Sequence, residues 1–418
     1  MLLQKPAFLL FYHTRAAEAS FGEWLGVLWH GLSLDCTVAG YVTAFPVVVV
    51  LASFWIPLSQ RVWRIILTVY FSLIALVTAA IFAVDLNLYG YWGFRLDGSV
   101  LIYLADPGEA LASASWGEVL RQIIIMLVYA GAMIWSYRRI LRLFRVEPVS
   151  LRGRIVPTVA ALLIGGLTFL AIRGGVTVAT ANVSKVYFSS NMFLNHAATN
   201  PVFSFLSSVG DNENYAEAYP FFEEERRKTL FEELRGNRPG ADAGTPRLLR
   251  SDRPNVVLIL LESFGRTIMD ETVNGEPVMP NMQRFKREGV WFENFFANSF
   301  RTDRGQVAVL CGFPAQTTMS IMKLPRKSAT LPSLARSLGR EGYRSVFMYG
   351  GDLNFTNQAS FMYSTGWEEL IWQKDMQLDA PTSKWGYADD VVVDLFGDEV
   401  EALGRAEQPF LAGLLTLS

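Results

Sequence analysis

Glu262 and Thr302 are the two residues whose types and positions are best suited to chemistry. Glu262 directly follows the apolar run NVVLILL at Asn255–Leu261, which is typical of a strand buried on both faces of a parallel sheet. Ligands of open α/β sheets bind beyond the carboxyl ends of the strands, so a carboxylate there is well placed to hold a metal ion. Thr302 precedes a second apolar run, Val307–Leu310, which predicts a helix.

Thr302 has two interpretations. A hydroxyl at a helix start either caps the helix or acts as a nucleophile activated by a cation and the helix dipole. The peptide Phe300–Gly305 alone favours the cap. Glu262 shifts the balance toward the nucleophile, because a metal ion and a hydroxyl together can attack a phosphoester. Arg301 and Arg304 are then candidates to clamp the oxygens of the transferring phosphoryl group.

The elements that must position these residues alternate between helix and strand. The pattern predicts a helix at Met279–Gly289, a strand at Val290–Ala297, a helix at Thr330–Glu341 and a strand at Ser345–Tyr349. Further on, Asp389 and Asp390 begin a helical pattern and are expected to stabilise its N-terminus. Strands that alternate with helices predict a doubly wound α/β domain.

Four long apolar runs precede this α/β region. A helix needs about 20 apolar residues to cross a hydrocarbon core of about 30 Å, and the runs that qualify are residues 37–58, 65–84, 119–137 and 155–172. The shorter run Pro6–Tyr12 is either the remnant of a fifth helix or an interfacial segment. The sequence therefore predicts a transmembrane domain at 1–173, an extracytoplasmic linker with a helix at 174–253, and an α/β domain at 254–418.

The charges between these runs predict their orientation. Two connections, Gln60–Arg64 and Arg138–Arg154, are rich in arginine, whereas Asp85–Glu118 carries five acidic residues against Arg95 alone. Basic loops remain in the cytoplasm. The α/β domain is therefore expected on the outer side of the membrane.

Composition excludes other classes of protein. The chain has 37 Lys and Arg against 39 Asp and Glu, and this near-neutral balance, without a basic run, argues against nucleic-acid binding. Cys36 and Cys311 are too few for a disulfide framework, and we expect both to be buried. The histidines are interpreted as structural, since a lone histidine is more often part of the scaffold than a ligand; they are His13, His30 and His196.

Ordered motifs in the α/β region resemble the lipoteichoic acid synthase branch of the alkaline phosphatase and sulfatase superfamily. They are PNVVLILLESFGR (254–266), MPNMQRFKREGVWFENFFANSFRTDRG (279–305), GFPAQTTMS (312–320), LPSLARSLGREGYRSVFMYGGDLNFTN (331–357) and SKWGYADD (383–390). The multi-span N-terminal half is similar too. A formylglycine sulfatase is not expected, because the residues after Cys311 lack the required proline and arginine spacing.

The resemblance implies a site and a reaction. Glu262 matches the family's carboxylate metal ligand, and Thr302 matches the threonine that binds the metal, attacks the phosphorus and carries the covalent intermediate. The implied cofactor is a divalent cation, Mn²⁺ or Mg²⁺. The implied enzyme lies in a bacterial inner membrane with its catalytic domain outside, and moves a phosphorylated head group, glycerol phosphate or similar, from a phospholipid donor to a cell-envelope acceptor.

The chain departs from the family pattern near residue 356. Thr356 and Gln358 stand where glycerol-phosphate polymerases of this family carry a tryptophan and an arginine that hold the head group, so the head group stays open. Asp352 and Asn354 are candidates to replace those side chains, although such a string is also typical of an ordinary loop turn.

A second departure concerns the metal site. The family's remaining ligands, an aspartate–histidine pair, and a further substrate histidine lie downstream of the strand that Phe410–Ser418 matches. We therefore expect a C-terminally truncated domain that is inactive as it stands. Three functions remain open: a phosphotransferase, a phosphoesterase that passes the group to water, and a catalytically dead membrane protein.

Overall fold

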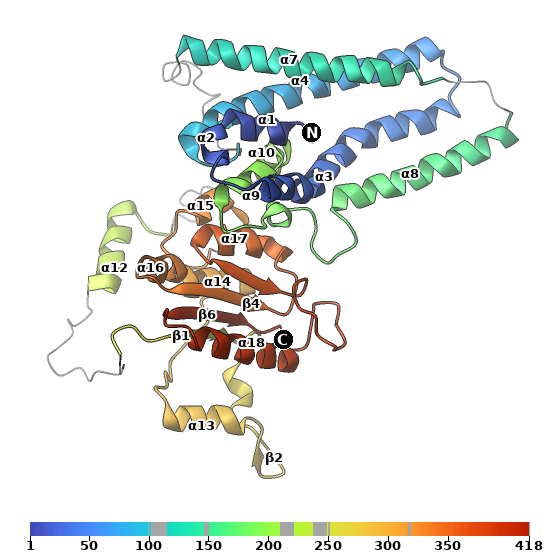
Figure 1. Cartoon of the computed structure of the whole chain (residues 1–418). Coiled ribbons are helices and arrows are strands. Elements are labelled where there is room, and N and C mark those ends of the chain that lie inside the picture. The colour runs from blue at the N-terminus through green and yellow to red at the C-terminus, as the bar shows by residue number, and fades with distance from the viewer. Residues whose placement is uncertain are drawn as a thin grey trace.

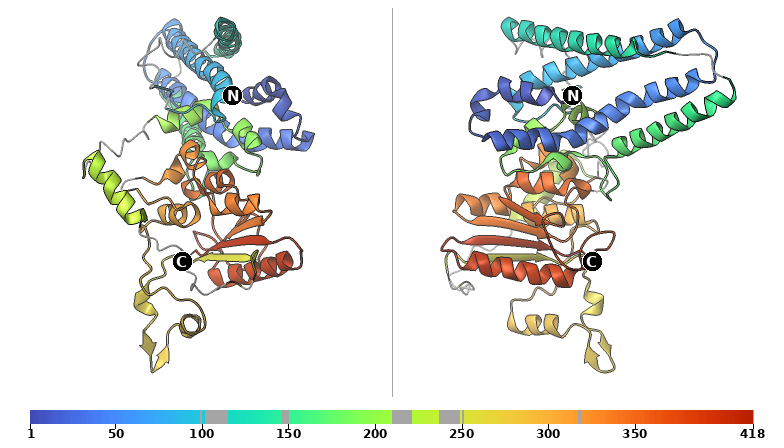
Figure 2. Two further views of the ribbon diagram at one scale, coloured as in Figure 1. Left: turned by 90° about the vertical axis from the view of Figure 1, so that its left-hand side faces the viewer. Right: turned by 45° about the vertical axis from the view of Figure 1, so that its right-hand side comes forward.

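The protein is divided into an N-terminal unit of helices and a C-terminal α/β domain (Figure 1). The computed structural model describes residues 1–98, 100–101, 115–145, 150–209, 221–236, 249, 251–316 and 319–417. The α/β domain lies beside one end of the long helices, and the two units are in contact (Figures 1 and 2). Within the predicted linker at 174–253, residues 210–220, 237–248 and 250 fall outside the described residues.

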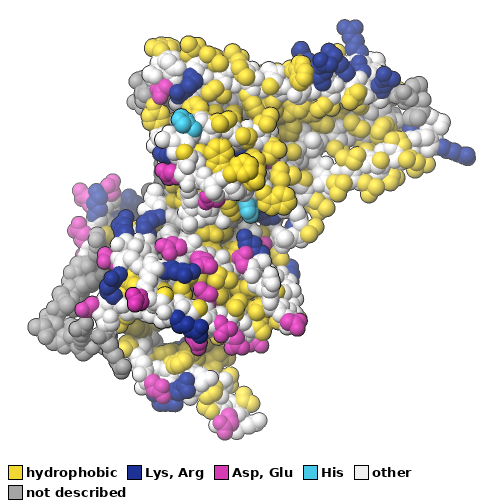
Figure 3. Space-filling view, viewed as in Figure 1, with side chains coloured by type: hydrophobic (Ala, Val, Ile, Leu, Met, Phe, Trp, Pro, Cys, Tyr) yellow, Lys and Arg dark blue, Asp and Glu magenta, His cyan; other side chains and the backbone are white. Residues whose placement is uncertain are grey.

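Four long helices in the described part of the chain are apolar enough to cross a membrane, as predicted. They are α3 (Phe21–Ser53), α4 (Gln60–Trp92), α7 (Trp116–Leu141) and α8 (Ile155–Arg173). The helix α3 packs against α8, and α4 packs against α7. Their outer surfaces are covered by apolar side chains (Figure 3). The structure thus confirms a multi-helix apolar domain followed by an α/β domain, and the protein is a membrane protein.

The boundaries of α3 and α4 differ from the predicted spans. The helix α3 begins at Phe21, and Ser20 and Glu23 form a reciprocal capping box at its start. It ends at Ser53, so residues 54–58 of the predicted span form a turn. Both helices extend beyond the predicted spans, past Asp35 in α3 and past Asp85 in α4. Hydropathy alone ends a span at such a charge, so the sequence did not predict these extensions.

Short helices pack around one end of this bundle. They are α1 (Gln4–Phe11), α2 (His13–Ala16), η2 (Val183–Val186), α9 (Met192–Ala198) and α10 (Pro201–Ser208). Phe8 and Leu9 of α1 are buried in the same core as Leu34 and Leu194. The run that was expected to be a fifth-helix remnant or an interfacial segment is therefore part of the core of the N-terminal unit.

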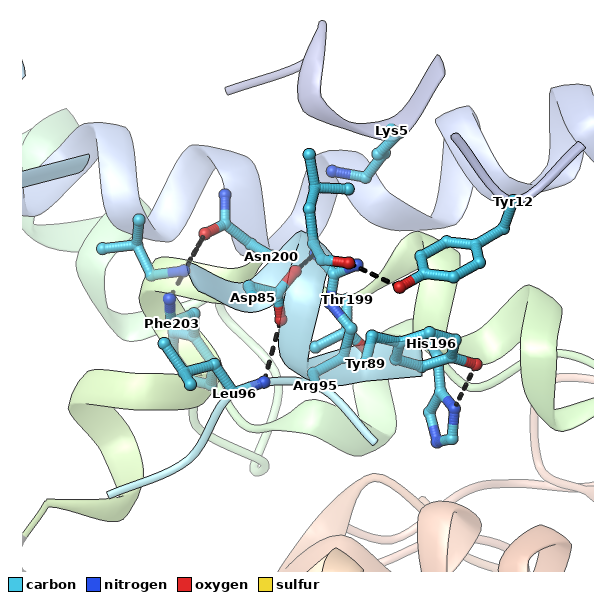
Figure 4. Close-up of polar contacts among 12 residues, drawn as sticks. Lys5, Tyr12, Asp85, Tyr89, Arg95, Leu96, His196, Thr199, Asn200 and Phe203 are labelled. Carbon is cyan, nitrogen blue, oxygen red and sulfur yellow. Dashed lines mark hydrogen bonds and ion pairs between the residues drawn. The ribbon is translucent and has the colours of Figure 1, made fainter. Parts of the chain in front are cut away.

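Two buried ion pairs lie at this end of the N-terminal unit, and Figure 4 shows the residues of one of them, Asp85 and Arg95. The ammonium of Lys5 lies 2.7 Å from the carboxylate of Asp35, which also accepts a 2.7 Å hydrogen bond from Asn200 Nδ2. Asp85 pairs with Arg95 at 3.2 Å and accepts a hydrogen bond from the backbone N–H of Leu96. All of these charged side chains are at least nine-tenths buried, so each charge depends on its partner.

The α/β domain contains a parallel sheet in the order β1-β6-β4-β5. Its strands are β1 (Val256–Leu260), β4 (Arg344–Tyr349), β5 (Glu369–Trp372) and β6 (Phe410–Leu415). The helices α14 (Thr302–Cys311), α16 (Leu334–Arg340) and α17 (Gln358–Thr365) contribute to the core on one face, and α18 (Asp389–Gly404) covers the other. Helices on both faces of a parallel sheet confirm the predicted α/β class.

Smaller elements complete the described chain. They are η1 (Arg152–Arg154), α12 (Glu224–Gly236), η3 (Arg266–Ile268), the hairpin of β2 (Thr272–Val273) and β3 (Glu276–Pro277), α13 (Pro280–Glu288), η4 (Ile321–Lys323), α15 (Pro325–Ser328) and η5 (Phe355–Asn357). The helix α13 and the β2–β3 hairpin extend away from the sheet, on the side opposite the long helices (Figure 1).

Three local predictions need correction. Val290–Ala297 forms no strand, because it lies in the segment that extends away from the sheet and has no strand to pair with. The strand β1 is not buried on both faces, since it lies at the sheet edge and leaves Val257 and Ile259 47% exposed. Cys36 is exposed on α3, although Cys311 is buried as expected.

Removal of a buried charge partner should destabilise the N-terminal unit. Asp85→Ala leaves the Arg95 guanidinium buried without its counter-ion, so we expect a loss of about 3–5 kcal/mol in the free energy of unfolding. Glu224→Ala breaks an exposed ion pair with Lys228 and should cost less than about 1 kcal/mol. Unfolding of the purified protein in mixed micelles measures both, and equal stability of the two variants would contradict the prediction.

Candidate functional site

Glu262 and Thr302 meet at the carboxyl end of β1. The Oγ1 hydroxyl of Thr302 donates a 2.7 Å hydrogen bond to Oε2 of Glu262, although 40 positions separate them in the chain. Both side chains are half-buried. Thr302 is the first residue of α14, and Arg301 occupies the N-cap position with an extended backbone. The hydroxyl of Thr302 therefore contacts the carboxylate, and the simple capping interpretation does not hold.

The neighbouring strand fixes the backbone of Glu262. The Glu262 N–H donates a 2.7 Å hydrogen bond to Oγ1 of Thr416, and the Thr416 N–H donates to the carbonyl of Leu260. Ser263 then takes a positive φ of 54°, which turns the chain sharply away from the strand. Thr416 was missed by the sequence analysis, because a threonine after a strand carries no signal until its neighbour in the sheet is known.

Acidic side chains surround the phenol of Tyr349, which ends β4. Burial, followed by the negative charges of Glu262, Asp352 and Asp389, raises the pKa of Tyr349 to about 12. The phenol therefore keeps its proton at neutral pH and is available as a hydrogen-bond donor. Asp389 begins α18, as predicted, and its Oδ1 accepts a 2.6 Å hydrogen bond from the Leu417 N–H. The ends of β1, β4 and β6 thus place several oxygen atoms at one edge of the sheet.

The two arginine candidates flank Thr302 in different environments. The guanidinium of Arg301 is half exposed, and its Nε lies 3.8 Å from Oδ1 of Asp303. The guanidinium of Arg304 lies 6.0 Å from the centre of the Phe300 ring. Their place as phosphoryl clamps stays a prediction.

Asp352 and Asn354 bond to each other. The backbone N–H and the side-chain amide of Asn354 both donate to Oδ1 of Asp352 at 2.9 Å, in an Asx-type turn. The carbonyl of Asn354 accepts a 2.7 Å hydrogen bond from Asn182 of the N-terminal unit. Gln358 is buried and accepts a hydrogen bond from Gln306, so it packs inside the domain. The geometry of this loop is structural, and its contact with a head group remains a prediction.

The oxygen atoms of Glu262 and Thr302 suit part of the shell of a hard cation. Mg²⁺ and similar ions prefer oxygen ligands and about six of them. In the described part of the chain, no group of three His, Cys, Asp or Glu side chains lies close enough together to hold a metal ion. Glu262 and Thr302 therefore supply two ligands of the correct chemical type. A carboxylate and a hydroxyl in hydrogen-bond contact are compatible with a shared cation in place of the proton between them.

The comparison with protein families falls on this same region. Residues 254–418 match the family described as Sulfatase. The match covers the α/β domain and less than half of the chain, so this domain is sulfatase-like. This finding confirms the predicted resemblance to the alkaline phosphatase and sulfatase superfamily, and the match begins immediately before β1.

Curated relatives of this sulfatase-family domain carry one name. Phosphoglycerol transferase I of Xanthomonas campestris pv. campestris is 35% identical over 178 residues, which are 40% of this chain and 25% of the relative. Phosphoglycerol transferase I of Salmonella paratyphi B is 28% identical over 172 residues, or 39% of this chain and 22% of the relative. The chain thus spans about a quarter of the length of the curated relatives that it matches.

Two solved structures are similar to part of the chain. A protein in the alkaline phosphatase superfamily from Vibrio parahaemolyticus is 24% identical with a TM-score of 0.41, covering 47% of this chain and 49% of that one. The lipoteichoic acid synthase LtaP from Listeria monocytogenes is 20% identical with a TM-score of 0.37, covering 40% of each chain.

Cys311, at the end of the helix that carries Thr302, reports on the packing of the sulfatase-family domain. Burial raises the pKa of its thiol to about 11, so the reactive thiolate is scarce at pH 8. In a Cys36→Ser variant, in which Cys311 is the only thiol, we expect no labelling by a polar maleimide within minutes and full labelling after denaturation. Rapid labelling of the folded protein, checked by intact mass, would contradict this packing.

Proposed function

We propose that the protein is a membrane-anchored, metal-dependent phosphotransferase that moves a phosphorylated head group from a phospholipid to a cell-envelope acceptor. The observation that carries the proposal is the 2.7 Å hydrogen bond from the Thr302 hydroxyl to Glu262, at the strand ends of a sulfatase-family domain. The name phosphoglycerol transferase I of the curated relatives supports glycerol phosphate as the transferred group. Apolar helices beside this domain would keep the site near its lipid substrate.

The first half of the reaction forms a covalent intermediate on Thr302. Its oxygen attacks the phosphorus of the donor, a new P–O bond forms, and the bond between phosphorus and the diacylglycerol oxygen breaks. The hydroxyl proton leaves to a base as the new bond forms; without a cation, this proton lies in the hydrogen bond to Oε2 of Glu262. The diacylglycerol oxygen takes up a proton and departs. In the second half, an acceptor hydroxyl attacks the phosphorus and releases Thr302.

Glu262 and Thr302 would hold the divalent cation, Mn²⁺ or Mg²⁺. When bound, such an ion lowers the pKa of the hydroxyl and offsets charge on the phosphoryl oxygens. The N-terminus of α14 adds its positive end at Thr302, which favours the developing negative charge. Thr416 holds the backbone of Glu262 in place through its hydroxyl. The phenol of Tyr349 stays protonated and can therefore donate a hydrogen bond near these acidic side chains.

The arrangement of the helices supports an outer location for this domain. The turn between α3 and α4, the end of α7 and the start of α8 lie at the bundle end remote from the α/β domain (Figures 1 and 2). Lys and Arg side chains gather at that end (Figure 3). Basic loops stay in the cytoplasm, so we propose that four spans hold the catalytic domain outside the inner membrane of a bacterium.

Loss of the nucleophile should abolish transfer. In the complete protein with its full metal site, Thr302→Ala removes the attacking oxygen, so we expect diacylglycerol release from phosphatidylglycerol vesicles to fall at least about 1,000-fold. Thr302→Ser keeps the hydroxyl and should retain measurable activity. Thr272→Ala, an exposed threonine of β2, is the matched control and should be active. Full activity of Thr302→Ala would overturn the assignment, and product analysis distinguishes transfer from hydrolysis.

Cation binding tests the role of Glu262 without an activity assay. Glu262→Gln removes the charge of the proposed ligand and should weaken Mn²⁺ binding at least about tenfold in calorimetric titrations, since even outer-shell losses cost that much. The exposed Glu271→Gln is the control and should bind like the parent protein. Equal affinity of all three proteins would show that the ion is held elsewhere.

A further inference from the structure

A cavity of about 650 Å³ lies between the N-terminal unit and the α/β domain, and contains neither Glu262 nor Thr302 among its lining residues. Three parts of the chain contribute to it. Residues 94–98 follow the end of α4, and residues 178–208 include η2, α9 and α10. The third part is residues 323–327 with 355–357 of the α/β domain. The cavity therefore belongs to the contact between the two units.

Positive charge predominates in its lining. Four cations line the cavity against the single acid Asp97; they are Arg95, Lys323, Arg326 and Lys327. Asp97 is 3.3 Å from Arg326, and Arg95 is paired with Asp85. Lys323 and Lys327 lie in one short segment with exposed side chains. Clustered lysines beside a cavity attract anions.

His196 lines the same cavity and carries a buried polar atom that has no partner among the described residues. Its side chain lies almost wholly out of solvent, with 5% of the residue exposed, and Nδ1 is 3.1 Å from the hydroxyl of Tyr89. Nε2 is buried and has no hydrogen-bond partner among the described residues. In Figure 4 the imidazole points away from α1 and toward the α/β domain. An unpaired buried polar atom is unfavourable, and a polar ligand that reaches it would remove that cost.

We take the Tyr89 hydroxyl as the donor to Nδ1 of His196, and with this tautomer Nε2 is a donor. Burial, followed by the positive charges of Arg95 and Arg15, lowers the pKa of His196 to about 3, so the ring is neutral. A neutral imidazole whose Nδ1 accepts the Tyr89 hydroxyl carries its proton on Nε2. The cavity is then lined by an N–H donor and by lysine ammonium groups, which together match the oxygens of a phosphate ester.

The cavity lies at the depth of lipid head groups if α4 and α8 span the membrane. Arg95 is three residues past the end of α4, and Val178 is five residues past the end of α8. The head-group zone extends several Å beyond the hydrocarbon core on each side. Apolar side chains of Phe94, Val178 and Phe203 also line the cavity and would contact the glycerol and upper acyl carbons of a lipid.

We propose that this cavity binds an anionic phosphate ester of the glycerophosphate class, at a site separate from Glu262 and Thr302. The ester would contact the Nε2–H of His196 and the ammonium groups of Lys323 and Lys327. A phospholipid head group and a free glycerol phosphate share this chemistry. This anion site beside the membrane surface does not depend on whether Thr302 is a nucleophile.

Charge reversal of the exposed lysines tests the site without disturbing the core. The probe is dioctanoyl phosphatidylglycerol, titrated into the full chain in an uncharged detergent. Every protein in this experiment also carries Thr302→Ala, which excludes turnover of the probe. Lys323→Glu/Lys327→Glu should raise the Kd about tenfold. The matched control is Arg287→Glu/Arg340→Glu, which makes the same charge change at exposed positions outside the cavity and should stay within about twofold.

A second variant tests the buried donor. His196→Ala should raise the Kd about fivefold through the lost hydrogen bond, and its unfolding midpoint shows whether the N-terminal unit is intact. If it does not fold, the lysine variants still decide the question. Equal weakening by the cavity and control reversals would overturn the proposal, because it would indicate general attraction to the surface.

Two further probes identify the source of the anion. Dioctanoyl phosphatidylcholine, which is zwitterionic, should bind at least about tenfold more weakly, and equal binding would overturn the proposal in favour of an apolar cleft. Glycerol 1-phosphate that competes at similar concentration, with the same sensitivity to Lys323→Glu/Lys327→Glu, would support the site and identify a free ester as its ligand. If glycerol 1-phosphate does not compete and phosphatidylglycerol still binds with sensitivity to the lysine reversals, the result would support the site and identify a lipid as its ligand.

Discussion

The parallel register of β1, β6 and β4 is the constraint on which the candidate site depends. Because the three strands run in the same direction, their carboxyl ends meet at one edge of the sheet. Glu262 follows β1, Thr416 follows β6, and Tyr349 ends β4. Reversal of any one strand would separate these side chains. The hydrogen bond between Thr302 and Glu262 then depends only on the return of α14 to the same edge.

The N-terminal unit is held by a different kind of force. Its long helices expose apolar surface that lipid would cover, so burial within the protein contributes less to their association than in a soluble core. Buried charge pairs compensate for this, because a charge without its partner cannot remain buried. Lys5 and Asp35 join α1 to α3, Asn200 adds α10, and Asp85 with Arg95 ties α4 to the chain that follows it.

Residues with a local pattern were predictable, and residues defined by long-range contacts were not. The four apolar helices, β1, β4, α13 and α18 follow from runs and periodicity in the sequence, and Glu262 with Thr302 followed from their places beside such runs. Thr416 and Tyr349 acquire their environments only when the sheet order is known. Val290–Ala297 has strand-like composition but no neighbouring strand, and composition cannot reveal the absence of a partner in that part of the structure.

Hydrogen bonds, an ion pair and a cation–π contact connect the two units. Asn182 donates to the carbonyl of Asn354, the backbone N–H of Ser360 donates to Ser184, and Arg326 both pairs with Asp97 and stacks on Trp92 at 4.2 Å. Of the elements that these contacts join, η2, η5 and α15 also line the cavity, whereas α17 directly follows η5. A ligand in the cavity would therefore touch both units at once and stabilise the docked arrangement by its own binding energy. The loop of Asp352 directly precedes η5, and its negative charge acts on Tyr349 at the edge of the sheet that carries Glu262.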